Sequence, residues 1–258
     1  MASTSPPRTL EGKVAIVTGS SRGIGEAIAY DLASRGAKVT ITYSSDRSKK
    51  GADALVNRIK SEVNSSAIDV QCDLKDSEAP KKIVEASLTA FGPHIDILVN
   101  NAAIVSDKYT QDITAEHFDE VFYTNVRAPL FMLQAVLPHL RRPGRIINLS
   151  SVGGRQGYPG VGTYAASKAA MEGFTRVWAA ELGKDGTTVN AVNPGPVESE
   201  MLDQVAPSIV EPQLKATLVE QRAGRPEEIA EIIAFLASPA SSWVSGQCIS
   251  ASGGYHQY

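Results

Sequence analysis

The regular alternation of short apolar runs and helical patterns along nearly the whole chain constrains its fold most strongly. Strands are predicted at residues 13–18, 38–43, 67–72, 96–100, 145–149, 188–192 and 247–251. Helices are predicted at residues 23–34, 47–62, 77–91, 115–140, 162–183 and 226–238. Strands that alternate with helices in this way form parallel sheets with crossover helices. We therefore expect an α/β fold, a doubly wound sheet of about seven parallel strands with helices on both faces.

The length of 258 residues suits one large α/β domain. Residues 1–9 are polar and contain prolines, so we expect a flexible tail before a single domain at 10–258. The segment 196–225 carries three prolines among apolar residues and follows a predicted strand. Its length and its place at the edge of the sheet favour a lid over a ligand. A pair of ordinary surface helices is the alternative.

Charge and composition exclude several classes of partner. The net charge of −3 gives no general attraction to nucleic acid or to an anionic membrane. No run of about 20 apolar residues is present, so no membrane span is expected. Cys72 and Cys248 are expected to be reduced thiols rather than a disulfide, and we expect a cytoplasmic protein. The four histidines show no metal-ligand spacing, so no metal site is expected.

A glycine-rich turn, TGSSRGIG, links the first predicted strand to the first predicted helix. Glycines in such a turn allow positive φ angles and let backbone amides approach a pyrophosphate closely. The positive end of the helix that follows points at the same anion. The strand before the turn and the amphipathic helix after it favour a nucleotide site over a plain tight turn. The predicted cradle consists of Gly19, Ser21, Arg22, Gly23, Ile24 and Gly25.

The end of the second strand indicates which nucleotide is bound. In a dinucleotide fold, a carboxylate about 20 residues after the glycine turn accepts hydrogen bonds from the adenosine ribose. Here that position falls on Tyr43, which is followed by Ser44 and Ser45. Arg22 and these serines could instead contact a 2′-phosphate, so NADP(H) is favoured over NAD(H). Asp46 is the counter-argument, because a small register change would bring it near the ribose.

Tyr164 and Lys168 lie four residues apart in a predicted helix, with Ser151 thirteen residues before the tyrosine. Residues four apart share one helix face, so the ammonium can lie beside the phenol. A neighbouring cation favours the phenolate and lowers the tyrosine pKa from its ordinary value of about 10. A pKa near 7 would need roughly 4 kcal/mol of stabilisation, which the lysine and an oxidised nicotinamide ring could supply together. Ser151 would hold a carbonyl or alcohol oxygen against the phenol.

Taken together, these motifs resemble the short-chain dehydrogenase/reductase family over about residues 8–254. The family motifs occur in order as TGSSRGIG (18–25), Asp73 in CDL, NNAA (100–103), Asn125, Ser151, YAASK (164–168) and NPG (193–195). The resemblance is greatest to ketoreductases such as 3-oxoacyl-acyl-carrier-protein reductases and fungal polyketide or naphthol reductases. It implies a single Rossmann-type catalytic domain that reduces ketones.

The resemblance also implies roles for individual residues. Tyr164 would be the general acid in reduction, and Lys168 would lower its pKa and bind the nicotinamide ribose. Ser151 would polarise the carbonyl, and Asn125 would hold a water that links Lys168 to solvent. The other implied cofactor contacts are Asp73, Leu74, Asn101, Ala102, Ala103, Pro194, Gly195, Val197 and Ser199. The implied substrate pocket consists of Ser151, Gly153, Gly154, Tyr158, Tyr164 and Met201.

Departures from the family pattern are few. Ala103 stands where the family has glycine, Ser199 where it has threonine, and Ser252 where relatives often carry aspartate. None of these positions is a proton-transfer residue. Family members pair through the two helices expected at 115–140 and 162–183, which implies a homotetramer or a homodimer.

Two other functions remain open from the residues. One is an NAD-dependent alcohol dehydrogenase of the same family, and the other is a nucleotide-binding regulator that has lost catalysis. The substrate is expected to be a small ketone or alcohol, with a fairly hydrophobic cyclic or aromatic ketone favoured.

Overall fold

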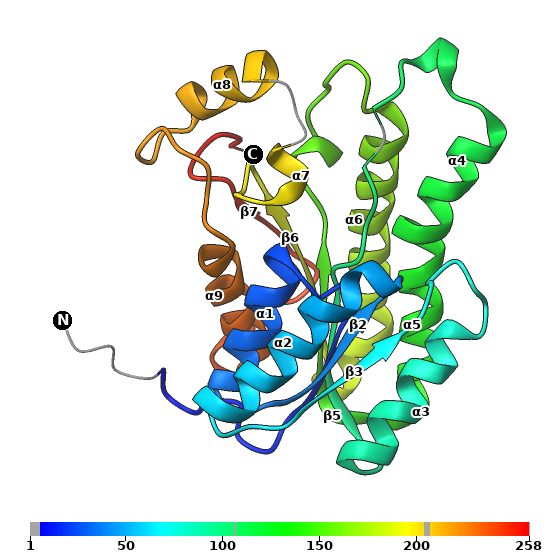
Figure 1. Cartoon of the computed structure of the whole chain (residues 1–258), viewed down its shortest axis with the longest axis vertical. Coiled ribbons are helices and arrows are strands. Elements are labelled where there is room, and N and C mark those ends of the chain that lie inside the picture. Colours follow the sequence, from blue (N-terminus) through cyan, green and yellow to red (C-terminus); the bar gives the residue numbers. More distant parts are fainter. Residues whose placement is uncertain (1–5, 106, 204–206, 258) are drawn as a thin grey trace.

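A computed structural model of the chain describes residues 6–105, 107–203 and 207–257, with backbone alone at 201 and 207–209. Within these residues, seven parallel strands form one sheet in the order β3-β2-β1-β4-β5-β6-β7 (Figure 1). The strands are β1 (Val14–Val17), β2 (Lys38–Tyr43), β3 (Ala67–Gln71), β4 (Ile95–Asn100), β5 (Leu140–Leu149), β6 (Thr188–Pro194) and β7 (Cys248–Ala251). The predicted Rossmann-type α/β fold is confirmed.

Helices cover both faces of this sheet. The α-helices are α1 (Gly23–Ser34), α2 (Asp46–Glu62), α3 (Ala79–Phe91), α4 (Ala115–Phe122), α5 (Ala128–Val136), α6 (Gly162–Leu182), α7 (Glu200–Asp203), α8 (Pro207–Ala216) and α9 (Pro226–Ala237). The shorter turns include the π turn η2 (Tyr123–Arg127) and the 3-10 helices η1 (Thr110–Asp112), η3 (Leu137–His139), η4 (Val152–Gly154), η5 (Gly183–Asp185) and η6 (Pro239–Ser241).

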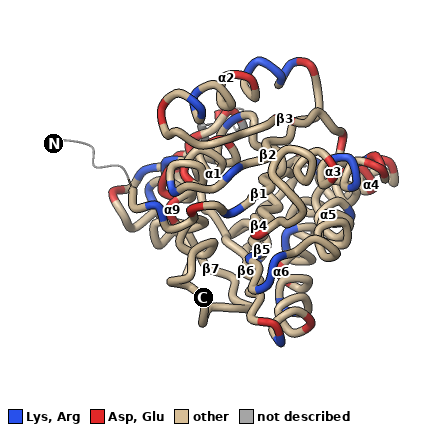
Figure 2. The backbone as a smooth tube through the Cα atoms, turned by 90° about the horizontal axis from the view of Figure 1, so that it is seen from below, with Lys and Arg blue, Asp and Glu red and all other residues tan. Residues whose placement is uncertain are grey.

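The hydrophobic core is divided into two layers by the sheet. Side chains alternate along a strand, so Ala15 and Val17 of β1 face one layer while Val14 and Ile16 face the other. The first layer packs the sheet against α1, α2 and α9, and the second packs it against α3, α5 and α6 (Figure 2). Both faces of β1 are fully buried, which explains its continuous apolar run.

The strand order reverses at β1. From this central strand the chain proceeds outward through β2 and β3, and then returns to place β4 on the other side of β1. In open parallel sheets, ligands bind at such a reversal, beyond the carboxyl ends of the strands. The loops after β1 and β4 meet there, and the loops after β5 and β6 continue along the same edge.

The helix predicted at 115–140 is interrupted, and that prediction was wrong in part. The chain instead forms α4, the π turn η2, α5 and η3 in succession. Pro129 is the second residue of α5 and has no amide hydrogen, so it cannot donate to the carbonyl of Asn125 four residues earlier. The π turn around Asn125 accommodates this missing bond, and the amide of Ala128 donates to Tyr123 five residues back.

Two strands, β5 and β6, extend further than the sequence predicts. β5 begins at Leu140 rather than near 145, because Leu140 pairs with Ile95 before a register shift in which the extra residues lie in β5. β6 continues to Pro194, where it pairs with Ala251 of β7.

The predicted lid at 196–225 contains α7 and α8, and its residues 204–206 lie outside the described residues.

The predicted tail and domain boundary fall near the first described residues. Residues 1–5 of that tail lie outside the described residues. Leu10, the first residue of the predicted domain, is buried, and its amide donates to the Arg35 carbonyl at 2.9 Å.

Candidate active site

The glycine turn after β1 is held against the loop after β4. Gly19 has φ of +63°, and a Cβ there would come within 2.8 Å of the Ala102 Cα. A Cβ on Gly25 would lie 2.4 Å from the Gly19 carbonyl oxygen and 2.5 Å from the Asn101 side-chain nitrogen. Glycine is therefore required at both positions by close backbone contact.

The loop after β4 makes the complementary hydrogen bonds. The side-chain amide of Asn101 donates to the carbonyls of Thr18 and Gly19 at 2.9 and 3.0 Å. The backbone amides of Asn101 and Ala102 both donate to the Thr18 hydroxyl. Ala103 follows as a half-buried residue. The sequence-predicted residues of the two loops are thus brought together at the strand reversal.

The start of α1 has the features of an anion site. Its N-cap residue, Arg22, makes no side-chain capping bond, so the first amides of the helix remain available as donors. Gly23 has φ of +58°, and a Cβ there would have nothing within 4 Å, so the space beside this turn is open. Ser21 is buried and Ile24 packs on the first core layer. These features fit the pyrophosphate of a dinucleotide.

Tyr43, which the sequence places near the adenosine ribose, has a buried side chain. It is the last residue of β2, is buried in the first core layer, and has a pKa raised by burial and by its hydrogen bond to Asp69. Ser44 and Ser45 beyond it are exposed. The carboxylate of Asp46 accepts a hydrogen bond from Gln71 at 3.0 Å, which occupies one of its oxygens.

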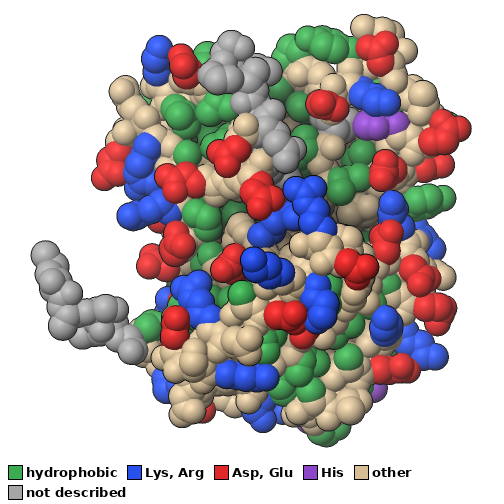
Figure 3. Space-filling view, viewed as in Figure 1, with side chains coloured by type: hydrophobic (Ala, Val, Ile, Leu, Met, Phe, Trp, Pro, Cys, Tyr) green, Lys and Arg blue, Asp and Glu red, His purple; other side chains and the backbone are tan. Residues whose placement is uncertain are grey.

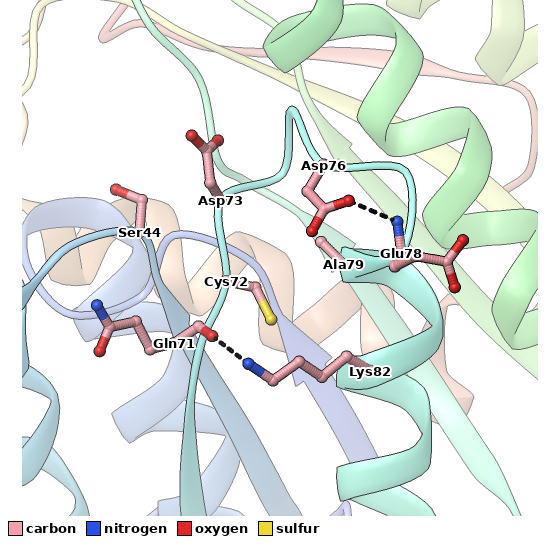
Figure 4. A pocket seen from close by; sticks show the side chains of 8 residues that line it. All are labelled: Ser44, Gln71, Cys72, Asp73, Asp76, Glu78, Ala79 and Lys82. Carbon is pink, nitrogen blue, oxygen red and sulfur yellow. Dashed lines mark hydrogen bonds between the residues drawn. The ribbon is translucent and has the colours of Figure 1, made fainter.

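A polar cavity of about 370 Å³ lies at the carboxyl ends of β2 and β3 (Figure 4). It is lined by Ser44, Gln71, Cys72, Asp73, Asp76, Glu78, Ala79 and Lys82. Two of these, Ser44 and Asp73, are predicted adenosine contacts, while Leu74 is buried beside them. Within the cavity, Lys82 donates to the Gln71 carbonyl at 3.1 Å, and the Glu78 amide donates to Asp76 at 3.0 Å (Figure 4).

Cys72 and Cys248 are both free thiols, as expected.

Ser151 and Tyr164 meet around Gly153. A Cβ added to Gly153 would lie 3.4 Å from the Ser151 hydroxyl oxygen, 3.7 Å from the Tyr164 ring and 4.0 Å from the Tyr158 ring. Burial raises the pKa of Tyr164 above its ordinary value, and a hydrogen bond with Ser151 offsets part of the rise. The phenol is therefore protonated at neutral pH in the protein chain alone.

Lys168 is buried under the same helix face. Its ammonium donates to the Leu149 carbonyl at 2.8 Å and lies 5.5 Å from the centroid of the Tyr164 ring. Burial lowers the pKa of Lys168 to about 8. The lowered tyrosine pKa expected from the sequence is thus not produced by this lysine alone, because desolvation has the larger effect on the phenol.

Asn125 lies in the π turn with its side chain fully engaged. Its side-chain amide donates to the Ile104 carbonyl at 2.9 Å and to the Ser167 hydroxyl at 3.0 Å, while its side-chain oxygen accepts from the Ile104 amide. Ser167 in turn donates to the Tyr164 carbonyl at 2.7 Å. The amide side chain therefore ties the loop after β4 to α6.

The predicted substrate pocket brings together segments far apart in sequence. A Cβ on Gly154 would lie 3.2 Å from the backbone of Lys168, so the turn η4 packs tightly on α6. The Tyr158 hydroxyl donates to the hydroxyl of Tyr255 at 2.8 Å, which places the C-terminal segment beside Ser151 and Tyr164. The predicted pocket residue Met201 has a side chain outside the described residues.

The predicted cofactor residues after β6 also contact the C-terminal segment and α7. A Cβ on Gly195, next to Pro194, would lie 3.0 Å from the Ser252 Cβ. Val197 is buried and pairs with Gly224. The Ser199 hydroxyl accepts a hydrogen bond from the Leu202 amide at 3.2 Å.

Sequence reasoning missed a buried carboxylate behind these residues. Glu172 accepts hydrogen bonds from Arg155, Ser150 and Asn193. Its spacing was the available signal, because Tyr164, Lys168 and Glu172 recur at intervals of four residues in one helix. Tyr255 had no such signal, since only the fold brings it to Tyr158.

Other kinds of site are not formed by the described part of the chain. In residues 6–105, 107–203 and 207–257, no group of three or more His, Cys, Asp or Glu side chains could hold a metal ion. Over the same ranges, no helix is long and apolar enough to span a bilayer. Basic and acidic side chains are intermixed on the face in Figure 3, which is consistent with the net charge of −3.

The chain is similar to known proteins over nearly its whole length. A family model described as enoyl-(acyl carrier protein) reductase matches residues 19–256. The short-chain dehydrogenase/reductase FrzI of a Cladobotryum species is 44% identical over 256 residues, which cover 96% of this chain and 98% of that protein. The hydroxynaphthalene reductase-like protein Arp2 of Metarhizium acridum is 40% identical over 268 residues, covering 98% and 99%.

A solved structure has the same fold. It is the crystal structure of a short chain dehydrogenase from Burkholderia cenocepacia J2315 in complex with NADP. The TM-score is 0.89 at 37% identity, and the match covers 96% of this chain and 99% of that one.

Proposed function

The chain belongs to the short-chain dehydrogenase/reductase family of oxidoreductases, and we propose that it is a ketoreductase that uses NADPH. It would transfer hydride to the carbonyl carbon of a small, fairly hydrophobic ketone. The observation that carries this proposal is the meeting of Ser151 and Tyr164 around Gly153, with Lys168 buried beneath them. A substrate oxygen in that position can bind two hydroxyl donors at once.

Tyr164 is proposed as the general acid. Reduction of a ketone needs a protonated donor, and the raised pKa keeps the Tyr164 phenol protonated at neutral pH. Oxidation of an alcohol would instead need the phenolate, which the burial of this side chain disfavours. The protonated phenol is therefore the form that the proposed reduction uses.

The bound nicotinamide would supply the hydride, and the chain would position and protonate the substrate. Ser151 donates a hydrogen bond to the carbonyl oxygen, and Tyr164 delivers a proton to it as negative charge develops. Lys168, with a pKa of about 8, is mostly charged at pH 7 and so can bind the nicotinamide ribose. Pro194, Gly195, Val197 and Ser199 would face the carboxamide.

Asn125 is proposed to act through its backbone. Its side chain is used by Ile104 and Ser167, so a water that reprotonates the Lys168 and Tyr164 pair has to be held elsewhere. Since Pro129 has no amide hydrogen, the Asn125 carbonyl lacks its usual helical donor and can accept one from water.

NADP(H) is proposed over NAD(H) because of the charges near the second strand. Arg22 and the hydroxyls of Ser44 and Ser45 are exposed there, and Asp46 is engaged by Gln71. Arg22 also pairs with Glu200 at 3.5 Å, and both side chains are more than half exposed, so this contact yields readily to a phosphate. The relative from Burkholderia cenocepacia was solved with NADP, which supports the same preference.

A cyclic or aromatic ketone is the proposed substrate class. The Tyr158 and Tyr255 rings would form one wall of the pocket, and burial keeps the pKa of Tyr158 well above its ordinary value, so this wall stays uncharged. The relative from Metarhizium acridum is named a hydroxynaphthalene reductase-like protein, which supports an aromatic ketone.

The test is oxidation of NADPH and NADH, followed at 340 nm, with a panel of quinones, cyclic ketones, 3-oxoacyl thioesters and enoyl thioesters. We expect turnover of ketones with a higher kcat/KM for NADPH. A higher kcat/KM for NADH with alcohol oxidation would favour an NAD-dependent alcohol dehydrogenase. Tight NADPH binding without turnover of any substrate would favour a non-catalytic regulator.

A further inference from the structure

Glu172 is a buried charge for which the proposed reaction has no direct use. It lies on α6 four residues after Lys168 and eight after Tyr164, so the three side chains share one face of the helix. Its side chain is only 7% exposed. A carboxylate this deeply buried is stable only when donors compensate for the lost water.

The donors come from three different segments of the chain. Arg155, just after η4, donates through Nε to Glu172 Oε2 at 2.6 Å. Asn193, near the end of β6, donates through its side-chain amide to Oε1. Ser150, directly after β5, donates through its hydroxyl to the same oxygen at 3.4 Å. The carboxylate thus joins α6 to the ends of two strands and to the turn between them.

Two of these donors also hold the backbone of proposed catalytic residues. The Asn193 side-chain amide donates to the Ser151 carbonyl at 3.2 Å as well as to Glu172. The Ser150 hydroxyl is shared between Glu172 and the Lys168 carbonyl, which it reaches at 3.1 Å. Glu172 is therefore one side chain removed from the backbone of both Ser151 and Lys168.

We propose that Glu172 is a positioning residue for hydride and proton transfer. With Arg155, it fixes the Ser151 segment and the strand end that carries Pro194 and Gly195 relative to the helix of Tyr164 and Lys168. The inference rests on the proposed function, since it assigns Glu172 to that same site. Its physical basis is the steep dependence of group transfer on geometry, where a displacement of about 1 Å costs about 100-fold in rate.

The variant Glu172→Gln tests the charge with little change of shape. The glutamine has one acceptor oxygen in place of two, and its NH₂ group would face a donor from Arg155 or Asn193. We expect kcat to fall about 10- to 100-fold while the KM for the ketone changes by less than about threefold. The kinetic isotope effect with 4-deuterated NADPH should rise, because hydride transfer then limits turnover.

Cofactor binding provides a readout that does not need turnover. NADPH should bind Glu172→Gln at least about threefold more weakly, because the network borders the predicted nicotinamide end of the site. Adenosine 2′,5′-bisphosphate, which would occupy only the adenosine end at Ser44 and Asp73, should bind the variant and the wild type equally. If the variant binds both ligands more weakly by the same factor, the substitution destabilises the whole protein, and the proposal is overturned.

Two matched variants separate positioning from stability. Ile83→Val removes one methylene from a fully buried core position on α3 and should lower the melting temperature without the loss of kcat. Arg155→Met should reproduce the kcat defect, and the double variant with Glu172→Gln should be no worse than the more impaired single variant. An unchanged kcat in folded Glu172→Gln, or losses that multiply in the double variant, would also overturn the proposal.

The two proposals fail differently. If the wild type reduces no ketone with either cofactor, the proposed function fails. The role of Glu172 is then tested by whether Glu172→Gln weakens the binding of NADPH but not that of adenosine 2′,5′-bisphosphate. If the wild type is active and Glu172→Gln matches it in kcat, isotope effect and NADPH affinity, only the role of Glu172 fails.

Discussion

Two neighbouring ionisable side chains, Tyr164 and Lys168, have pKa values moved in opposite directions by the same burial. Burial raises the pKa of the Tyr164 phenol and lowers the pKa of the Lys168 ammonium to about 8, so both shifts are toward the neutral form. Each shift has a separate consequence. The phenol remains a proton donor at neutral pH, and the lysine charge is present at a cost in stability.

Replacing Tyr164 with phenylalanine removes only the proposed proton donor. We expect kcat to fall by at least about 100-fold, because general acid catalysis contributes about that much or more. The dissociation constant for NADPH, measured by fluorescence titration, should remain within about twofold of the wild-type value. A variant with near wild-type turnover would show that another group supplies the proton.

The buried lysine predicts a pH-dependent stability difference for Lys168→Met. The folded-state pKa of about 8 is below the ordinary value of 10.5, so between these values the unfolded chain binds more protons. Wild-type stability should therefore rise with pH in this window relative to the variant, which carries no such charge. Urea unfolding at pH 7 and pH 10 should show the variant losing about 2 kcal/mol of relative stability. A constant difference between the two pH values would contradict the lowered pKa.

For single residues, the sequence identified the side chains proposed to carry the chemistry better than it predicted what surrounds them. It singled out Ser151, Tyr164 and Lys168, but it expected the lysine to lower the tyrosine pKa. Desolvation depends on what the fold packs over a side chain, which residue spacing does not reveal. For the same reason Glu172 was overlooked, although its spacing from Lys168 was visible.

The π turn at Tyr123–Arg127 is the element on which the proposed water site depends. Its cause is local, since Pro129 cannot complete the helical bond to the Asn125 carbonyl. A carbonyl left open in this way is the proposed water site, and π turns often occur at functional sites.

Pro129→Ala should restore the missing amide donor. We expect an α-helical bond to the Asn125 carbonyl to compete with the water, so kcat should fall about tenfold while the NADPH dissociation constant stays unchanged. Steady-state kinetics at several pH values would measure this effect. Full activity in the folded variant would show that the Asn125 carbonyl does not hold the water that reprotonates Lys168 and Tyr164.

The sequence predicted elements well where local signals were complete. α1 and β2 have the predicted bounds, because a glycine turn and an apolar run define them. The break after α4 was missed because the 3.6-residue apolar period continues across it. The early start of β5 was missed because Leu140 joins the sheet through a bulged pairing with β4, which is a long-range contact.

The whole molecule presents an apolar face on α4, η2, α5 and α6. Phe118, Tyr123, Phe131 and Val177 are all exposed on these elements. An apolar depression of about 280 Å³, lined by Phe122, Tyr123, Val126, Arg127, Leu130 and Phe174, lies between them. Exposed apolar surface of this kind is typical of an interface. It supports the assembly implied by the family, a homotetramer or a homodimer.

Val177→Lys should weaken that assembly. A charge at this exposed apolar position would be desolvated if two copies pair through α6, so the mass from sedimentation should fall at least by half. Val219→Lys, at an exposed apolar position outside this face, serves as the control and should leave the mass unchanged. A monomeric wild type would rule out the predicted oligomer.

The strands on the two sides of β1 are encoded by separate parts of the gene, because the strand order reverses at β1. The chain passes from one side of β1 to the other once, between β3 and β4, so Ser44 and Asp73 are encoded before Asn100. Ser151, Tyr164 and Tyr255 are all encoded after it. A recombination between relatives near codon 100 would therefore exchange the residues proposed to bind the adenosine without changing those proposed to bind the carbonyl. Under the proposed function, nucleotide preference and substrate preference could then be inherited separately, and each could change in evolution while the other stays the same.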